Sequence, residues 1–513
     1  MITGKNLVGG VWESSATEVV FKIVNPNTKE QLTTSFQEAT SDQLSQAAEK
    51  ASAAFEVYST SSFQMRAQFL RAIQEEIRNN SNEILAIYQV ESALPEGRAK
   101  GELQRTLDQI ERFINLLNEG SFSQAIIHTQ GPDLRKVLFP IGPIVVFGAS
   151  NFPLAFSTAG GDTISAFAAG CPVVVKAHPY HAGTSELVAQ AIQTAIQKMK
   201  LPHGLFSHLG GESHAVGSSL VAHPLVKGVG FTGSFKGGKA LYDLAQKRSE
   251  PIPVFAEMGS VNPMFILENK LKTDGTLAAD LASSIALGTG QFCTNPGLIV
   301  LCDPENKSGF IDQIRKEINE IPLPPMVHAN IEANYHEHLT ALDTINEDVQ
   351  LHTSDNSHAA IGVVSASHFK MNPSLSEEVF GPFSMIVCCQ NLDEMIDVAE
   401  GLNGQLTATI LGTEADQKAI RLLLSKVQPK VGRILFEGVP TGVAVTQAMQ
   451  HGGPYPASTD SRFTSVGSDA IYRWLRPLAF QDCPDALLPL PLQNQNPLGI
   501  QRNVNGLLTN KAL

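Results

Sequence analysis

The sequence predicts an α/β protein with two parallel, helix-covered sheets. From residue 143 onward, short apolar runs rich in β-branched residues alternate with helical patterns, which is typical of parallel sheets buried on both faces. The alternation occurs in two series that meet near residues 257–263. We therefore expect two α/β domains in this chain of 513 residues.

The segments before the sheets are mostly helical. Residues 1–35 have the pattern of short strands and turns. The ranges 41–58 and 62–89 place apolar residues at three- and four-residue intervals, and each begins with a serine that can cap a helix. The uncharged stretch 137–161 is long enough to cross a bilayer, but its prolines and glycines favour a strand, a turn and a buried helix.

The strands and helices of the two series can be assigned in order. The first series comprises the strand-like runs PIVVFGA, CPVVVKA, LFSHL, VKGVGF and PVFAEM, with helices expected over 153–170 and 183–199. The second comprises PMFIL, GLIVLC, MIVCC and ATILG, with a helix over 277–289. The proline-rich tail from Arg476 has weak periodicity, so we expect an extended arm that lies on another subunit.

The composition is that of an acidic globular protein. A formal net charge of −13 argues against nucleic acid or an anionic membrane as the partner. The six cysteines show no CxxC spacing, and the N-terminus has no basic segment followed by an apolar run. We therefore expect reduced thiols, no signal peptide and a cytoplasmic location.

Polar or glycine-rich segments follow four of the predicted strands. They begin at Ser150, His178, Thr232 and Glu257, and the carboxyl ends of parallel strands form the ligand-binding edge of such sheets. The run GVGFTG at 228–233 matches G-x-G-x-x-G, but two of its glycines fall inside a strand pattern, so it is weak evidence. The segment 233–238 opens a helix whose free amides can bind a phosphate, with an ordinary glycine turn as the alternative.

Cys293 lies in GTGQFCTNPG, a run that cannot form a regular core helix or strand. A nucleophile would be placed on such a loop, although most single cysteines are structural.

Glu257 has three interpretations. It can bind a ribose, act as a general base with a pKa raised by its apolar surroundings, or be a solvent-facing carboxylate at a strand end.

Six motifs occur in the order found in one known family. They are Asn151 in SNFPLAF, Lys176 after PVVV, FTGSxxxG at 231–238, Glu257 in EMGSVNP, Cys293 in GQFCTNPG and EEVFGPF at 377–383. Over essentially the whole chain, the sequence resembles the NAD(P)-dependent aldehyde dehydrogenases. Within that family, ITGKNLVGG, HGGPYPAS and NPLGIQR are most similar to bacterial ketoglutaric semialdehyde (2,5-dioxovalerate) dehydrogenases, followed by NADP-linked long-chain aldehyde dehydrogenases.

The resemblance implies a fold with a Rossmann-like cofactor domain, an α/β catalytic domain and a small β oligomerisation arm. The cofactor domain is expected over 1–127 and 147–258, the catalytic domain over 259–470, and the arm over 128–146 and 471–513. It also implies a homodimer or a homotetramer.

The resemblance also assigns roles. Cys293 is expected to attack the aldehyde, the Asn151 amide and the Cys293 N–H to hold the oxyanion, and Glu257 to activate water against the resulting thioester. The hydride passes to NADP or NAD, and no metal is needed. The residues expected to contact the cofactor are Lys176, His178, Thr232, Gly233, Ser234, Gly238, Glu378 and Phe380.

Three positions depart from the family pattern. Pro179 stands where strict NAD users carry a glutamate, so a 2′-phosphate is not repelled and His178 could donate to it, which makes NADP acceptable. Ser260 replaces a glycine near the cofactor, which we expect to be a minor change. His451 in HGGPYPAS is expected near the site, with either a catalytic or a structural role.

Other functions are weighed against hydrolytic aldehyde oxidation. An acylating dehydrogenase that uses coenzyme A usually lacks the glutamate base, and a Cys/His/Asn thiol hydrolase leaves the phosphate loop unexplained. A catalytically inactive structural protein of the same fold would not need cysteine, asparagine and glutamate together.

Among aldehydes, the resemblance favours 2-oxoglutarate semialdehyde over a long-chain fatty aldehyde. The residues expected at the substrate entry are Ser150, Phe152, Phe156, Phe292, Thr294 and Phe463, with His451 and Arg462 as partners for a carboxylate.

Overall fold

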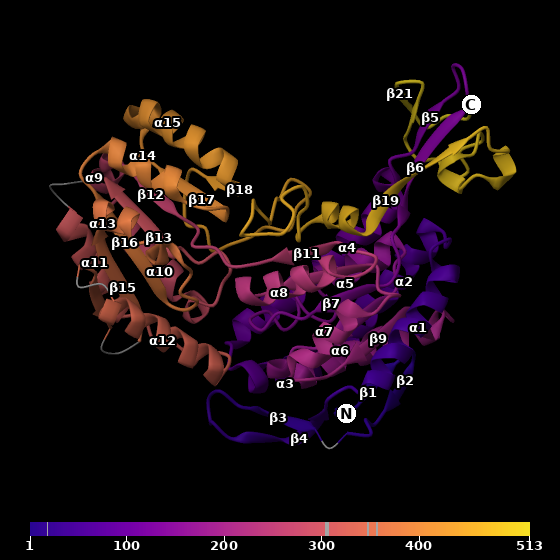
Figure 1. The fold of residues 1–513 in the computed structure, drawn as a ribbon, viewed down its shortest axis with the longest axis horizontal. Helices are drawn as coiled ribbons and strands as arrows, with labels where there is room; N and C mark the ends of the chain where they lie inside the picture. Colours follow the sequence, from indigo (N-terminus) through magenta and orange to yellow (C-terminus); the bar gives the residue numbers. More distant parts are fainter. Residues whose placement is uncertain (18, 303–306, 346–347, 355–357) are drawn as a thin grey trace.

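The computed structural model describes residues 1–17, 19–302, 307–345, 348–354 and 358–513. Within them the chain forms two seven-stranded sheets, a five-stranded sheet and a hairpin of β3 (Val20–Val24) and β4 (Gln31–Gln37). Figure 1 shows the two large sheets in opposite halves of the molecule, with the five-stranded sheet projecting from one side. This arrangement is the expected α/β fold with two domains and an arm.

The first large sheet has the order β11-β10-β7-β8-β9-β1-β2. Its parallel strands are β7 (Ile144–Phe147), β8 (Val173–Lys176), β9 (Phe206–Leu209), β10 (Gly228–Thr232) and β11 (Val254–Glu257), and β1 (Asn6–Val8) and β2 (Val11–Glu13) extend it in antiparallel fashion. The chain runs from β7 to β8 and β9 and then returns to β10 on the other side of β7. Ligands bind such sheets at the carboxyl ends of the strands beside the reversal.

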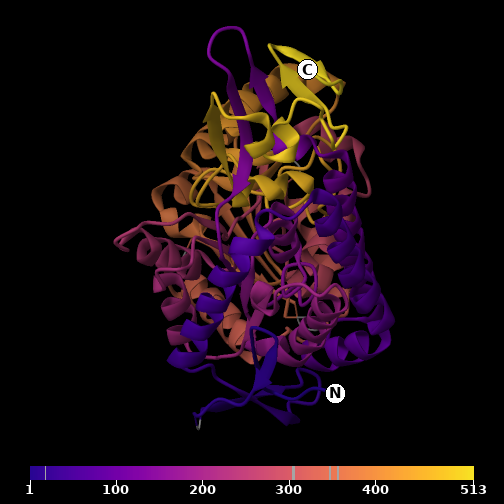
Figure 2. The same ribbon diagram turned by 90° about the vertical axis from the view of Figure 1, so that its right-hand side faces the viewer.

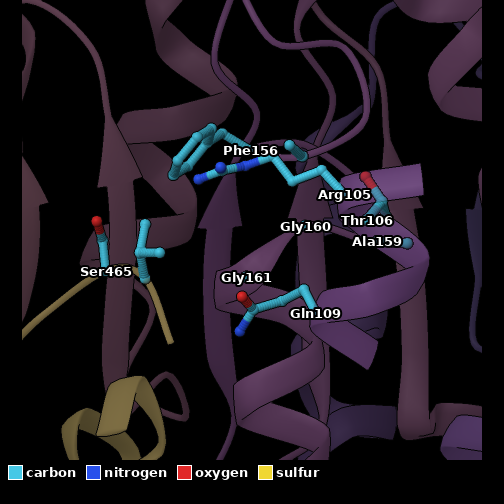
Figure 3. A pocket seen from close by; sticks show the side chains of 10 residues that line it. Arg105, Thr106, Gln109, Phe156, Ala159, Gly160, Gly161 and Ser465 are labelled. Carbon is cyan, nitrogen blue, oxygen red and sulfur yellow. The ribbon is translucent and has the colours of Figure 1, made fainter. Parts of the chain in front are cut away.

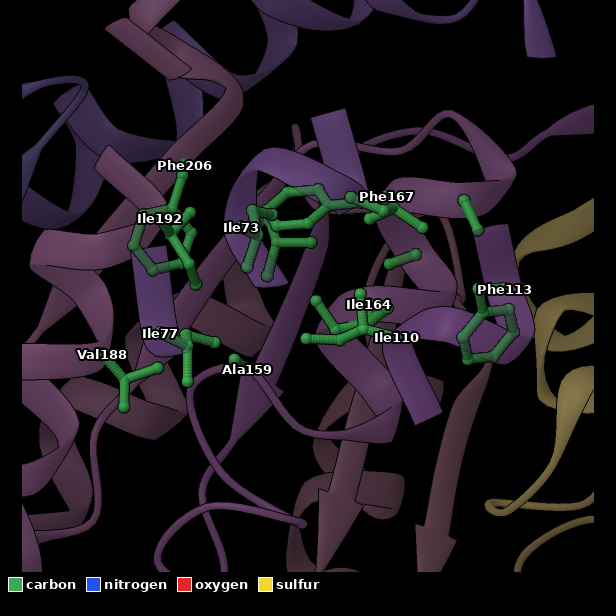
Figure 4. Packing of buried hydrophobic residues seen from close by; sticks show 14 of the residues in the cluster. Ile73, Ile77, Ile110, Phe113, Ala159, Ile164, Phe167, Val188, Ile192 and Phe206 are labelled. Carbon is green, nitrogen blue, oxygen red and sulfur yellow. The ribbon is translucent and has the colours of Figure 1, made fainter. Parts of the chain in front are cut away.

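Successive residues of these strands contact opposite helix layers, because side chains alternate between the two faces of a sheet. Val146 and Val175 pack in one buried cluster and Val145 and Val174 in another. One face is covered by α1 (Ser41–Tyr58), α7 (His214–Ala222) and α8 (Phe235–Gln246). The other is covered by α5 (Gly161–Ala169) and α6 (Ala182–Lys198), with α2 (Phe63–Asn79), α3 (Ser81–Ser92) and α4 (Glu96–Glu119) outside them. Figure 4 shows the aliphatic and aromatic core of this second face around Phe167.

The second large sheet has the order β14-β15-β16-β13-β12-β17-β18. Its strands are β12 (Met264–Ile266), β13 (Leu298–Cys302), β14 (Gln350–Thr353), β15 (Ala360–Ser365), β16 (Phe383–Cys389), β17 (Gln405–Leu411) and β18 (Val431–Leu435). All neighbours are parallel except β14 and β15. Helices α10 (Leu277–Ala286) and α11 (Lys307–Asn319) cover one face, and α12 (Ala329–Ile345), α13 (Ala366–Met371), α14 (Leu392–Gly401) and α15 (Gln417–Val427) pack on the other.

The arm is a five-stranded sheet made from segments far apart in the sequence. Its order is β19-β6-β5-β20-β21, with β5 (Ile126–His128), β6 (Leu134–Pro140), β19 (Leu475–Gln481), β20 (Arg502–Val504) and β21 (Leu507–Thr509). Figure 2 shows this sheet at one end of the molecule and the N-terminal strands at the other. The edge strand β21 leaves the side chains of Leu507 and Leu508 exposed.

The structure corrects several expected boundaries. Thr40, not Ser41, caps α1, because its side chain accepts from Gln43 N while the Gln43 side chain binds back to it. The helix expected over 62–89 is interrupted at Asn80, and the one expected over 153–170 begins only at Gly161. Residues 144–146, assigned to the arm, belong to β7 of the first large sheet, while β5 of the arm begins two residues early, at Ile126. None of the helices in the described residues is long and apolar enough to span a membrane.

Candidate active site

Cys293 lies on a tight loop between α10 and β13. The three residues Gly288, Thr289 and Gly290 all adopt positive φ, with values of 57°, 56° and 66°. A Cβ on Gly290 would come within 2.1 Å of the backbone of Gly381, so only glycine fits this contact. The loop of Cys293 is therefore fixed against segment 377–383.

Two asparagine amides hold the same loop. Asn262 Nδ2 donates to the carbonyl oxygens of Cys293 and Asn295, both at 2.8 Å. Asn151 Nδ2 donates to the carbonyl of Gln291 at 2.9 Å. The expected oxyanion donor thus lies beside the nucleophile loop, and Asn262 is a positioning residue that the sequence analysis did not identify.

Cys293, Glu257 and His451 form one cluster at the junction of the two large sheets. Glu257 ends β11 of the first sheet, and Cys293 precedes β13 of the second. His451 Nε2 lies 3.1 Å from Glu257 Oε1 and 3.5 Å from Cys293 Sγ. Ser465 Oγ donates to Glu257 Oε2 at 2.6 Å. The structure therefore brings together three residues that are up to 194 positions apart (451 minus 257).

The electrostatics of the cluster differ from the sequence expectation in one respect. Burial raises the pKa of Glu257, but the His451 ring and the Ser465 hydroxyl outweigh it and hold that pKa below its ordinary value. The expectation of a raised pKa was wrong because it considered only the apolar surroundings. Burial, together with the Glu257 carboxylate, raises the pKa of the Cys293 thiol well above its usual range. At rest the pair is thus a carboxylate beside a protonated thiol.

A cavity of about 300 Å³ opens onto Cys293 and His451. Phe152, Phe156, Phe292 and Thr294 line it as expected. Among the described residues, Ser150 and Phe463 are not part of the lining, and the Phe463 ring packs on Phe255 at 5.1 Å between centroids. The expectation that Arg462 lies at the substrate entry is also wrong, because its side chain is 79% exposed and pairs with Asp460.

Two other arginines line this cavity, and both come from α4. The Arg98 guanidinium lies 4.2 Å and 4.4 Å from the ring centroids of Phe152 and Phe292. The Arg105 guanidinium lies 5.8 Å from the centroid of Phe156 and donates to the carbonyl of Val443. Figure 3 shows Arg105 extending toward Phe156, with Ser465 on the far side of a smaller adjoining cavity. Their seven-residue spacing on an amphipathic helix was the sequence signal that could have identified them.

The expected phosphate site lies at the start of α8. Ser234 caps this helix by accepting from Gly237 N at 3.2 Å, and the preceding Thr232 ends β10. Gly233 N–H is not free, because it donates to the carbonyl of Glu257 at 3.1 Å. A Cβ on Gly238 would come within 2.7 Å of Met258, so this glycine lets α8 pack on β11. The Gly237 and Gly238 amides donate to Ser234, so the first turn of α8 offers an anion the amides of Phe235 and Lys236.

Lys176 and His178 follow β8 at the same sheet edge. Lys176 Nζ donates to the carbonyl of Gly211 at 2.7 Å, and burial lowers the pKa of Lys176 to about 8. His178 Nδ1 accepts from Tyr180 N at 3.3 Å, and burial holds the His178 pKa well below its ordinary value. His178 is therefore neutral and can offer a phosphate a hydrogen bond but no positive charge.

Glu378 and Phe380 lie on the loop that contacts Gly290. Burial, with the nearby Glu257 carboxylate, raises the pKa of Glu378 to about 7 against the effect of its backbone hydrogen bond with Ser260. A Cβ on Gly259 would come within 2.5 Å of Glu378 Oε2, so a side chain there would fill the space of this carboxylate. Phe380 is half-buried on the same loop. The chemistry of these groups, a phosphate-binding helix start together with a lysine and a carboxylate at one edge, fits a dinucleotide.

Ser260 has a larger structural role than expected. Its hydroxyl donates to Gln405 Oε1 at 2.9 Å and accepts from Leu406 N at 3.0 Å. A glycine could not make these contacts, so Ser260 connects the end of β11 to β17 of the second sheet.

Comparison with known proteins identifies the family. The model of the aldehyde dehydrogenase family matches residues 12–454. The chain belongs to the aldehyde dehydrogenase family. The alpha-ketoglutaric semialdehyde dehydrogenase 2 of Azospirillum brasilense is 43% identical over 478 residues, which cover 90% of this chain and 91% of that protein. The alpha-ketoglutaric semialdehyde dehydrogenase of Acinetobacter baylyi is 43% identical over 496 residues, or 92% of this chain and 93% of that protein.

Solved structures of aldehyde dehydrogenases share the fold. The betaine aldehyde dehydrogenase of Staphylococcus aureus in complex with NAD⁺ gives a TM-score of 0.81 at 18% identity and covers 94% of each chain. A variant of the Thermus thermophilus 1-pyrroline-5-carboxylate dehydrogenase gives a TM-score of 0.80 at 19% identity, covering 93% of this chain and 92% of that one. The expected family and fold class are therefore confirmed.

Proposed function

We propose that this aldehyde dehydrogenase oxidises 2-oxoglutarate semialdehyde to 2-oxoglutarate with NADP or NAD. The observation that carries the substrate assignment is the pair Arg98 and Arg105 in the cavity above Cys293. Two guanidinium groups face the cavity and one carboxylate, Glu102, which lies 3.6 Å from Arg98 Nε and also accepts from Tyr88 and two backbone amides. The pair of arginines therefore leaves a net positive charge. A substrate with a carboxylate at the end remote from its aldehyde would find a cationic partner there. The names of the two relatives at 43% identity point to the same substrate.

The reaction begins with Cys293. Its thiol must lose a proton before it can attack, and the ionised Glu257 carboxylate beside it is the acceptor. Attack of Sγ on the aldehyde carbon forms a thiohemiacetal oxyanion, which the Asn151 amide and the Cys293 N–H hold. When bound, the nicotinamide supplies the hydride acceptor. Loss of hydride from the thiohemiacetal carbon leaves a thioester on Cys293, whose C–S bond is then cleaved by water.

Glu257 also activates that water. Its pKa is held low enough for the carboxylate to be ionised near neutral pH, and it lies beside the sulfur that carries the acyl group. His451 keeps Glu257 ionised and lies close to both Glu257 and Cys293. We therefore assign His451 a positioning role.

The cofactor would be held at the edge formed by β8, β10 and α8. The α8 amides bind the pyrophosphate, Lys176 and Glu378 bind the two riboses, and Thr232, Ser234 and Phe380 surround them. Because Pro179 follows His178 directly and offers no carboxylate, a 2′-phosphate meets no like charge there. We propose that NADP is accepted as well as NAD.

The arm is proposed to join copies of the chain into a homodimer or a homotetramer. Within the described residues, the edge strand β21 pairs with β20 on one side only, and it carries the exposed side chains of Leu507 and Leu508. Such an edge is normally covered in a folded protein.

The proposed substrate can be tested by comparing aldehydes of equal length. The specificity constant kcat/KM should be higher for an ω-carboxylated aldehyde than for the uncharged one at low salt. Arg105→Gln or Arg98→Gln should reduce this preference at least about tenfold, while Arg462→Gln, which removes an exposed arginine, should leave it unchanged. Equal constants, or a rise with chain length, would instead assign a fatty aldehyde, which the aromatic lining could accommodate.

A further inference from the structure

The cluster at Cys293 combines three different metal-binding atoms. Cys293 Sγ, His451 Nε2 and a Glu257 carboxylate oxygen all lie within 4.8 Å of one another. The Sγ–Nε2 distance is 3.5 Å and the Nε2–Oε1 distance is 3.1 Å. A thiolate, an imidazole and a carboxylate form a donor set that Zn²⁺ prefers over Mg²⁺ or Ca²⁺.

The S–N and N–O distances are close to those between ligands of a tetrahedral zinc ion. With Zn–S near ~2.3 Å, Zn–N near ~2.0 Å and Zn–O near ~2.1 Å, tetrahedral angles place sulfur ~3.6 Å from nitrogen and nitrogen ~3.4 Å from oxygen. The two measured separations agree with these values to within a few tenths of an ångström. The third, between sulfur and the carboxylate oxygen, is within 4.8 Å.

The carboxylate is also oriented for this role. Glu257 Oε2 accepts from Ser465 Oγ, while Oε1 lies 3.1 Å from His451 Nε2 and faces the other two members of the cluster. The side chains of His451 and Glu257 are 1% and 3% exposed, so both are held in place by packing. Cys293 and His451 line the large cavity, through which an ion and a fourth ligand could reach the site.

We propose that Cys293, His451 and Glu257 bind one Zn²⁺ ion in the resting enzyme and that this ion blocks aldehyde oxidation reversibly. Binding forms a Zn–S bond and releases the thiol proton to solvent, with no change of oxidation state. The ion then occupies the sulfur that must attack the aldehyde and the carboxylate that must act as base. Binding itself does not depend on the proposed function, because it requires neither aldehyde nor cofactor.

Zn²⁺ binding can be measured by calorimetry on the full-length enzyme without substrate. We expect one ion per chain, release of protons in buffers of different ionisation enthalpy, and no binding of Mg²⁺. Cys293→Ser, His451→Ala and Glu257→Gln should each weaken binding more than about tenfold. Ser465→Ala should weaken it by a smaller factor, because the Ser465 hydroxyl only orients the Glu257 carboxylate. Cys483→Ser removes a half-buried thiol remote from the site and should change nothing.

Two further readouts keep the test independent of variant folding. In the unaltered enzyme, Zn²⁺ should protect Cys293 from iodoacetamide, and a chelator should restore both alkylation and aldehyde oxidation. Co²⁺ should give the sulfur-to-metal charge-transfer band and the intense visible bands of a tetrahedral site. Undiminished affinity in His451→Ala, unprotected Cys293, or full activity with Zn²⁺ bound would each overturn the proposal. Loss of substrate preference alone would bear only on the proposed function.

Discussion

His451 Nε2 lies 3.1 Å from Glu257 Oε1, and the two side chains are almost entirely buried. The same ring nitrogen therefore lies close to both the proposed base, Glu257, and the proposed nucleophile, Cys293, whose sulfur is 3.5 Å away. Because burial alone would raise the pKa of Glu257, the carboxylate depends on this ring and on Ser465 for its charge. The state of the catalytic base is thus set by a residue from a loop 194 positions further along the chain (451 minus 257).

Replacing His451 with Asn should move the pH dependence of kcat. Without the ring, burial dominates and the pKa of Glu257 rises, so the carboxylate becomes protonated at a higher pH. Activity should fall as the pH decreases through this raised pKa, and the acidic limb of the profile should shift upward relative to the unaltered enzyme. The KM for the cofactor should stay within about twofold, because His451 lies outside the dinucleotide edge. If kcat is lower at every pH but the acidic limb of its pH profile stays at the same pH, the positioning role of His451 is refuted.

Glu257→Gln should separate the two halves of the reaction. Solvent can take up the thiol proton when the carboxylate is absent, so single-turnover mixing should still give a burst of reduced nicotinamide, although a slower one. Steady-state turnover also requires activation of water and should fall further, by about 10²–10⁴-fold. Cys293→Ala is the matched variant, with neither burst nor turnover but with cofactor binding retained. Equal loss of burst and steady state in Glu257→Gln would show instead that removal of the thiol proton, and not activation of water, is the step that depends most on the glutamate.

Cofactor affinity should depend on pH in a bell-shaped manner. Burial raises the pKa of Glu378 to about 7. Above that pH its side chain is an ionised carboxylate, which accepts stronger hydrogen bonds from the ribose hydroxyls. Burial lowers the pKa of Lys176 to about 8, so its ammonium loses charge above that pH. Titrations of the dissociation constant should show a maximum affinity between these values. Glu378→Gln should flatten the acidic limb and Lys176→Arg the alkaline one, and limbs that survive both changes would place the titrating groups elsewhere.

Gly290→Ala should destabilise the enzyme and displace the nucleophile. The new methyl group would overlap the backbone of Gly381, and the positive φ at residue 290 adds strain. We expect a loss of about 2–4 kcal/mol in the free energy of unfolding, measured in urea, together with loss of activity. Gly297→Ala in the same loop is the control, because its Cβ would meet neighbours only at 3.4 Å and beyond. Equal stability of the two variants would show that the Gly290 contact is not tight.

Much of the fold could be predicted from the sequence because its signals are local. The β-branched runs around residues 144, 173 and 298 correspond to β7, β8 and β13, since a strand buried on both faces must be apolar throughout. Helix starts were less predictable. Thr40 rather than Ser41 caps α1 because the Gln43 side chain accepts a hydrogen bond from the Thr40 backbone. The residue types alone do not show which of the two positions makes this contact.

The sequence pointed to Cys293, Glu257 and Asn151 because the motifs that contain them, GQFCTNPG, EMGSVNP and SNFPLAF, resemble those of the aldehyde dehydrogenases. Their mutual distances could not be predicted, because these distances depend on how two separate sheets pack against each other. The tertiary structure also decided the ionisation of Glu257, since the pKa of a buried carboxyl depends on its neighbours, and His451 and Ser465 are distant in sequence. The cationic residues of the cavity could not be predicted for the same reason. Arg462, expected there, is exposed, whereas α4 places Arg98 and Arg105 in the lining.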